Sequence, residues 1–190
     1  LPGEVFHLKV AHRPSWGIRM DSVRQVIEAA RSRGVDVAAD MYVYTAGGTG
    51  LEATIPSWAF EGGGDSLRAR LANPEIRARL KREQQTGSPG WWNIVESAGG
   101  WDGVILVNAR NPENAKYERK SLSEAVTDVL VTRGDRQVAH TVVRNKGARF
   151  SDAAFRLLVK RSASDDTLAL GIGERRDLPR QHFLDLLEQA

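Results

Sequence analysis

The sequence predicts an α/β fold built on parallel strands, and three segments within its first 45 residues carry this prediction. Residues 4–10 are a short strand candidate, residues 20–30 carry apolar side chains at helical spacing, and residues 35–44 are apolar enough for a buried strand. A strand, a helix and a second strand over about 40 residues make a βαβ unit with parallel pairing. Barrels and doubly wound sheets both contain such units, so the residues alone leave the two open.

The helix of this unit has recognisable boundaries. Asp21 or Ser22 is suited to cap its N-terminus, and Val26 and Ile27 fall on one apolar face. Gly34 stands where a residue in the left-handed conformation ends a helix. These signals predict that the chain turns back after residue 34 to enter the second strand.

Glycines and short helices are expected in the middle of the chain. Residues 45–64 contain six glycines, which argue for a loop. Asp65 is placed to cap a helix, and a second helix is expected from Pro74 to Gly87. Residues 91–95 and 103–107 are apolar and predict strands.

The last third of the chain predicts further helices and one strand. Ser121 or Ser123 is expected to open a helix that Gly134 closes. Residues 138–143 predict a strand, and residues 151–160 and 178–189 predict amphipathic helices. No internal repeat is evident in the residues.

Composition and charge limit the classes of partner. The 27 basic and 24 acidic residues give a formal charge of +3 and are intermixed, which is typical of solvated helices rather than of a nucleic-acid surface. The sequence has no cysteine, which excludes disulfides and thiolate metal sites. The apolar runs are too short to span a bilayer, and no signal peptide is visible. We therefore expect a cytoplasmic protein with neither nucleic-acid nor membrane partners.

Polar side chains stand at the carboxyl ends of the two predicted strands, where the active sites of parallel α/β folds lie. His7 and Lys9 share one side of the first strand, and Asp40, Tyr42 and Tyr44 share one side of the second. An imidazole can bind a metal, and a tyrosine hydroxyl can donate to a substrate. A histidine bonded to a neighbouring hydroxyl, beside tyrosines that favour strands, explains the same residues without function.

Other catalytic motifs do not fit the sequence. The four histidines, at positions 7, 12, 140 and 182, lack the spacing of a zinc motif. The glycine-rich residues 45–50 lack the ending of a phosphate-binding loop, and no nucleophile elbow of the Gly-x-Ser-x-Gly type is present.

Several runs together match the pattern of a known family. They are residues 6–11 (FHLKVA), 15–17 (SWG), 40–46 (DMYVYTA) and 55–59 (IPSWA). With these runs the chain resembles the N-acyl-D-amino-acid deacylases, or D-aminoacylases, of the amidohydrolase superfamily. The resemblance extends from about residue 4 to residue 124 and is loose beyond.

The resemblance implies a partial (β/α)8 TIM-like barrel of a metal-dependent hydrolase with a helical and loop insertion. Residues 1–45 would be the barrel βαβ segment, residues 46–120 an insertion over the barrel mouth, and residues 121–190 further barrel helices and a strand with a diverged tail. The implied reaction cleaves the amide of N-acyl-D-amino acids, which are small-molecule substrates, to a carboxylate and a D-amino acid. Zinc would be the cofactor with His7 as its ligand, and Lys9, Tyr42 and Tyr44 would bind the substrate.

The sequence also departs from the family pattern. The H-x-H motif and the catalytic aspartate of the family would lie outside residues 1–190, so we expect an interior fragment with no catalytic residue of its own. The parent would hydrolyse linear amides, whereas the chain alone, with His7 as a single ligand, should bind zinc weakly and be inactive. The alternatives are a related amidase with another amide substrate, or a catalytically inactive remnant or binding module. The residues indicate no oligomeric state.

Overall fold

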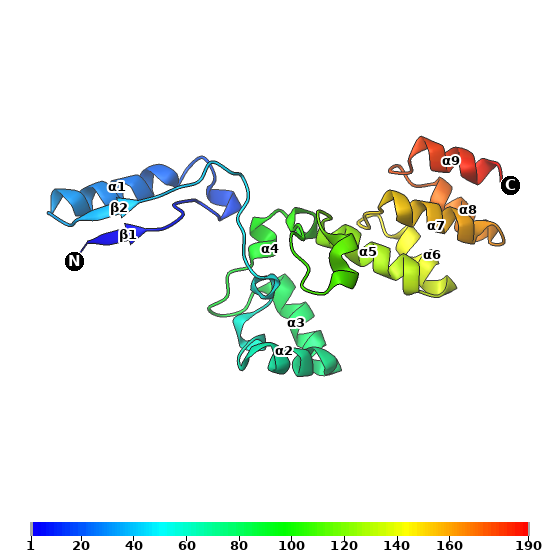
Figure 1. Cartoon of the computed structure of the whole chain (residues 1–190), viewed down its shortest axis with the longest axis horizontal. Coiled ribbons are helices and arrows are strands. Elements are labelled where there is room, and N and C mark those ends of the chain that lie inside the picture. The colour runs from blue at the N-terminus through cyan, green and yellow to red at the C-terminus, as the bar shows by residue number, and fades with distance from the viewer. Residues whose placement is uncertain (1, 190) are drawn as a thin grey trace. The chain divides into compact units, whose positions relative to one another are not determined.

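A computed structural model describes residues 2–189 of the chain, which Figure 1 traces from the N-terminus in blue to the C-terminus in red. The chain divides into two compact units, Leu1–Gly100 and Trp101–Ala190. Each unit is built from its own local elements. The division into three segments at residues 45 and 120 stays a prediction.

The first unit begins with a short parallel βαβ segment. β1 (Gly3–Val5) pairs in parallel with β2 (Val37–Ala39), and α1 (Met20–Ser32) connects them. α1 ends because Gly34 adopts a left-handed conformation with φ of 80°, from which its N–H donates to the Arg31 carbonyl at 2.9 Å. The parallel pairing and the glycine at the end of the helix are therefore confirmed.

This βαβ segment buries little of its own apolar surface. None of the 13 residues that the structure describes in α1 is buried, and the apolar Val26 is 70% exposed. Strands of parallel sheets are normally covered on both faces. In this segment the strand pairing and the hydrogen bonds within α1, rather than apolar packing, hold the strands and the helix in place.

The first unit further contains 3-10 helices and α-helices, of which η1 lies within the βαβ segment. In order, its elements are η1 (Arg13–Ser15), η2 (Leu51–Thr54), η3 (Ser57–Ala59), α2 (Gly63–Ala72), α3 (Pro74–Thr86) and α4 (Ile94–Ser97). The side chain of Asn73 accepts hydrogen bonds from the amides of Glu75 at 2.8 Å and Ile76 at 3.3 Å. Because proline is tolerated in a first turn, α3 begins at Pro74, as predicted.

Glu83 holds α3 against η3. Its carboxylate accepts a hydrogen bond from the indole N–H of Trp58 at 2.7 Å and from Nε of Arg79 at 2.6 Å. The Arg79 guanidinium also lies 3.8 Å from the centroid of the Trp58 ring. The bond from Trp58, followed by that from Arg79, lowers the pKa of Glu83 to about 2.

The second unit is made of helices. After η4 (Trp101–Gly103) and η5 (Pro112–Tyr117) come α5 (Leu122–Arg133), α6 (Arg136–Arg144), α7 (Asp152–Ser162), α8 (Asp166–Gly173) and α9 (Arg180–Leu187). α5 contacts α6 and α7, α6 contacts α8, and α7 contacts α8 and α9. By these contacts, the helices α5, α7 and α9 form one row, and α6 and α8 form a second row.

The helix pairs α5–α6 and α7–α8 repeat each other with a spacing of 30 residues. Ser121 and Ser151 cap α5 and α7, and each accepts a hydrogen bond from the amide three residues further on. Asp135 and Asp165 cap α6 and α8 in the same way. The expectation that the chain has no internal repeat is wrong, because the repeat is carried by caps and apolar positions rather than by identical runs of residues.

The core of the second unit draws on all five helices. Its members are apolar side chains that are less than a tenth exposed: Val131, Ala139, Val142, Val143, Ala148, Ala154, Leu158, Val159, Leu168, Ile172 and Leu186. Fully burying one Leu, Ile or Val side chain contributes about 1.5–3 kcal/mol. This cluster is therefore the main source of stability in the second unit.

Arg175 joins the core to the loops around it. Its Nη1 donates to the carbonyls of Val143 at 2.9 Å and Asn145 at 3.0 Å, and its Nη2 donates to the carbonyl of Ala148 at 3.0 Å. Nε and Nη2 also donate to the two carboxylate oxygens of Asp177, each at 2.8 Å. These contacts account for the five N–H groups of a guanidinium, and the side chain is only 7% exposed.

The predicted partial (β/α)8 barrel is wrong. Within residues 2–189 the only strands are β1 and β2, which have three residues each and form a two-stranded sheet. A barrel needs eight strands that close on themselves, whereas the segments that follow β2 form helices. Among the described helices, none combines the length and the apolar character needed to cross a bilayer.

Individual elements explain the difference. Residues 91–95 and 103–107, which predict strands, contribute to α4 and to an isolated bridge between Ile105 and Ser121. Residues 138–143 lie in α6, because the Asp135 cap starts a helix there. The helices predicted after Ser121 and over residues 151–160 and 178–189 are confirmed as α5, α7 and α9, whereas the sequence prediction lacks α8.

Replacing Arg175 by lysine should lower the free energy of unfolding by about 3 kcal/mol, because an ammonium cannot satisfy the three carbonyls and the carboxylate together. Urea unfolding of the full chain, followed by circular dichroism, measures the change. Arg176→Lys is the matched control at an exposed neighbouring position and should change stability by less than about 0.5 kcal/mol. Equal effects of the two substitutions would contradict the role of Arg175.

Replacing Glu83 by glutamine should make the first unit less sensitive to acid. A carboxyl group whose pKa is lowered from 4.5 to about 2 in the folded state stabilises that state above pH 4.5, and this contribution is lost as the pH falls toward 2. The stability difference between the unchanged protein and Glu83→Gln should therefore narrow over this range, as urea titrations followed by tryptophan fluorescence would measure. A difference that stays constant with pH would argue against the contacts of Glu83.

Candidate functional site

The structure brings the predicted site residues together at the carboxyl ends of β1 and β2. The ring centroids of His7 and Tyr42 lie 5.6 Å apart, and those of Tyr42 and Tyr44 lie 6.2 Å apart. The ammonium of Lys9 lies 4.9 Å from the centroid of the Tyr42 ring and donates to the carbonyl of His7 at 3.0 Å. The positions that share one side in the sequence thus form one largely exposed cluster.

Asp40 organises the backbone beside this cluster. His7 adopts a left-handed conformation with φ of 55°, and its N–H donates to Oδ1 of Asp40 at 2.6 Å. The N–H of Leu8 donates to the carbonyl of Asp40 at 2.7 Å. Asp40 therefore holds the loop that follows β1.

The cluster does not fit the predicted zinc ion. A catalytic zinc site uses three protein ligands. Within residues 2–189, no group of three or more histidine, aspartate or glutamate side chains is arranged to hold a metal. His7 therefore lacks companion ligands in this part of the chain, and the roles of Lys9, Tyr42 and Tyr44 toward a substrate stay predictions.

Two other histidines take part in local structure. Nδ1 of His12 lies 2.8 Å from the hydroxyl of Ser15. The side chain of His182 is only 4% exposed, and its Nε2 and Nδ1 lie 2.7 Å from Asp152 and 3.2 Å from Asp185. His182 therefore connects α9 to the first turn of α7.

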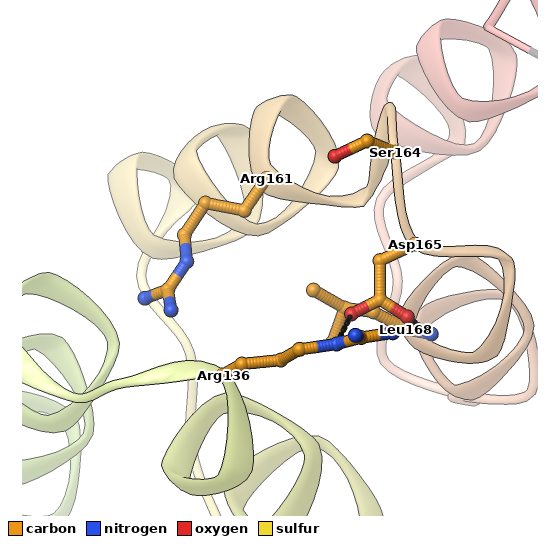
Figure 2. A pocket seen from close by; sticks show the side chains of 5 residues that line it. All are labelled: Arg136, Arg161, Ser164, Asp165 and Leu168. Carbon is orange, nitrogen blue, oxygen red and sulfur yellow. Dashed lines mark hydrogen bonds and ion pairs between the residues drawn. The ribbon is translucent and has the colours of Figure 1, made fainter.

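A second group of polar side chains surrounds a pocket in the second unit. This pocket, here named the arginine pocket, has a volume of about 240 Å³ and is lined by Arg136, Arg161, Ser164, Asp165 and Leu168. Figure 2 shows Arg161 and Arg136 on opposite sides of the opening, with Asp165 at one end. The lining side chains come from α6, α7, α8 and the loop before α8, so the pocket lies where the two repeats meet.

Asp165 anchors the arginine pocket. Its Oδ2 accepts a hydrogen bond from Nε of Arg136 at 2.7 Å and lies 2.9 Å from Nε2 of His140, while its Oδ1 accepts from the N–H of Leu168 at 3.1 Å. The Asp165 side chain is 5% exposed. The bond from Arg136, followed by those from His140 and Leu168, holds the pKa of this carboxyl well below its usual range.

Arg161 is held differently from Arg136. Its Nη1 donates to the carbonyl of Val131 in the last turn of α5 at 2.8 Å. In the part of the chain that the structure describes, no carboxylate forms an ion pair with this guanidinium. Arg161 therefore brings to the pocket a positive charge that no neighbouring side chain neutralises.

The arrangement is suited to binding an anionic group. The side chains that line the pocket include two guanidinium groups and one carboxylate, that of Asp165, so the lining carries a net positive charge. The planar fork of an arginine matches the two oxygens of a carboxylate or phosphate. The hydroxyl of Ser164 adds a possible donor at the edge of the pocket.

Sequence reasoning missed this pocket, although one local signal was present. Ser164, Asp165 and Asp166 precede an apolar run and are typical of a helix start, which would have placed α8. The equal spacing from Ser121 to Ser151 and from Asp135 to Asp165 would have indicated a repeat. No local signal brings the two arginines together, because they lie on different helices.

Comparison with known proteins gives one family match, and it falls in the second unit. A family model described as an uncharacterised protein conserved in bacteria (DUF2336) matches residues 118–190. No curated protein and no solved structure matches the chain. The segment similar to this family therefore contains α5–α9 and the arginine pocket.

The resemblance to the N-acyl-D-amino-acid deacylases is wrong. The family that matches is not an amidohydrolase family, and the structure has stacked helices in place of a TIM barrel. The assignment as a zinc amidohydrolase fails with it, since no metal-holding group is present within residues 2–189. The runs HLK and YVY lie in the segments that follow the two short strands β1 and β2, and such short runs do not determine the fold around them.

Substitutions of Asp165 separate its role as helix cap from its role as ion-pair partner. Asparagine caps a helix as well as aspartate does but carries no charge for Arg136, whereas alanine removes both contacts. We expect the melting temperature to fall by a few degrees in Asp165→Asn and by more in Asp165→Ala, as measured by differential scanning calorimetry at neutral pH. Asp166→Asn, at an exposed neighbouring position, should leave it nearly unchanged. Equal melting temperatures in the two Asp165 variants would show that the ion pair accounts for the whole effect and the cap for none.

Proposed function

We propose that residues 101–190 act as a helical-repeat binding module that holds an acidic segment of a partner protein at the arginine pocket. The observation that carries this proposal is the guanidinium of Arg161, which lines the pocket without a carboxylate partner among the described residues. A binding module is one of the alternatives that the sequence leaves open. The proposal places it on stacked helices rather than on a barrel.

The stacking of the helices supports a binding role. Helix-pair repeats contact mainly their neighbours, and their stacked rows present extended surfaces that such proteins use to bind partners. In this chain α6 and α8 form one row, and both contribute side chains to the arginine pocket. A peptide lying across α6 and α8 would therefore pass over the pocket.

The size and charge of the pocket favour a carboxylate side chain. Its volume of about 240 Å³ lies below the roughly 300–1,000 Å³ of pockets that enclose drug-sized ligands, which suits one side chain better than a whole cofactor. Hydrogen bonds between arginine and carboxylate are about twice as strong as those between neutral groups. Because three donors already engage Asp165, repulsion of an incoming carboxylate by this residue is reduced.

Binding of a fluorescein-labelled polyglutamate peptide to the full chain, measured by fluorescence anisotropy, tests the proposal. We expect saturable binding that weakens as salt is added, because the contact is an ion pair at the surface. Arg161→Gln should weaken binding about tenfold. Lys160→Gln is the matched control, since it removes the same charge from the adjacent exposed position of α7 and should change the affinity less than about twofold.

Two further binding measurements distinguish recognition by the arginine pocket from attraction by the overall charge of the protein. Arg161→Lys keeps the charge but loses the planar fork, so its affinity should lie between those of the unchanged protein and Arg161→Gln. A polyglutamine peptide of the same length should not bind. The proposal is contradicted if Arg161→Gln and Lys160→Gln weaken binding equally while circular dichroism shows both variants folded, since the peptide would then respond only to overall charge.

A further inference from the structure

The first unit contains an apolar pocket whose lining includes none of the residues of the cluster around His7. It has a volume of about 310 Å³, and three of its lining residues are aromatic: Phe60, Trp91 and Trp92. Ile55 and Ile94 add apolar walls, and Glu52 is its one charged lining residue. We propose that this pocket, here named the tryptophan pocket, binds an organic cation, namely an ammonium group that carries methyl substituents.

The walls of the tryptophan pocket are fixed by hydrogen bonds. The indole N–H of Trp91 donates to the carbonyl of Ala53 at 3.3 Å, which ties the loop before α4 to η2. Asn93 accepts from the first amides of α4 and donates through Nδ2 to the carbonyl of Gln84 at 3.2 Å. These bonds hold Trp91 and α4 in place, whereas Trp92 is 50% exposed and its ring remains accessible to a ligand.

The charge of the pocket comes from Glu52. Among residues 2–189, no donor forms a hydrogen bond or ion pair with its carboxylate. The carboxylate lies against the backbone of Gly50, where a Cβ would be only 2.2 Å from Oε1 of Glu52. The absence of a side chain at residue 50 thus leaves the space in which this carboxylate sits at the pocket.

This combination of groups selects a particular ligand chemistry. The faces of aromatic rings carry partial negative charge and attract cations, and a tryptophan ring does so most strongly. A carboxylate adds a full negative charge, which disfavours anions. Apolar walls favour methyl groups over the hydration shell of a bare ammonium. A methylated ammonium satisfies the rings, the walls and the carboxylate at once.

Choline and its uncharged carbon analogue 3,3-dimethylbutan-1-ol provide a matched pair of probes, because they share shape and differ in charge. Titration of the full chain with each probe, followed by tryptophan fluorescence and by calorimetry, measures binding. We expect choline to saturate the protein at millimolar concentration and to bind about tenfold more tightly than the alcohol. Free lysine, whose ammonium is unmethylated, should bind more weakly than choline.

Variants locate the binding within the chain. Glu52→Gln should weaken choline binding about fivefold and leave binding of the alcohol unchanged. Gly50→Ala should act in the same direction, because the new methyl group displaces the Glu52 carboxylate. Glu61→Gln removes an acidic side chain that does not line the pocket and should have no effect.

Several outcomes would overturn the inference. Equal affinities for choline and the alcohol would show an apolar pocket without selectivity for cations. Equal losses of choline affinity in Glu52→Gln and Glu61→Gln would show that choline does not bind in the tryptophan pocket. Choline binding that does not saturate would lead to the same conclusion. Because the arginine pocket takes no part in this experiment, its outcome is independent of the proposed acidic partner.

Discussion

The second unit depends on one buried guanidinium. Arg175, between α8 and α9, donates to carbonyls at the end of α6 and in the loop before α7, and it pairs with Asp177. Its guanidinium also lies 4.3 Å from the centroid of the Phe150 ring. The core itself is non-directional, since apolar side chains tolerate several packings. Arg175 adds the directional contacts that fix where α7 begins relative to the end of α6. The position of α7 in turn determines how the two helix rows are arranged.

The arginine pocket follows from the same construction, because its central residue serves the fold and the site at once. Asp165 caps α8 and pairs with Arg136 on α6, so the contact that joins the two repeats also orients one wall of the pocket. Arg161 is held by the carbonyl of Val131 at the end of α5. Backbone carbonyls at helix ends carry partial negative charge, which holds this arginine without neutralising it. A cation retained in this way is available to a ligand.

Local signals in the sequence were sufficient for part of the fold. Gly34 and the Ser121 cap each end or start a helix through contacts within a few residues, and the structure confirms both. Residues 138–143 form a helix although their valines favour strands, because the Asp135 cap and packing against α8 outweigh that preference. His7, Tyr42 and Tyr44 lie in the loops that follow β1 and β2, and they come together because the parallel pairing of the strands and the hydrogen bond from His7 to Asp40 place these loops side by side. The arginine pocket could not be predicted, because its walls come from three helices that meet only through tertiary packing.

The central claim is that the stacked helices of the second unit hold an acidic segment at the arginine pocket. Nuclear magnetic resonance of the isotopically labelled full chain tests it most directly, since it reports the fold and the binding site together. The account predicts helical chemical shifts over residues 136–144 and 166–173. On addition of a polyglutamate peptide, it predicts that the largest shift changes occur at the Nε–H of Arg161 and at the amides of Ser164 and Leu168. Extended chemical shifts over residues 138–143, or changes spread evenly over all exposed arginines and lysines, would contradict it.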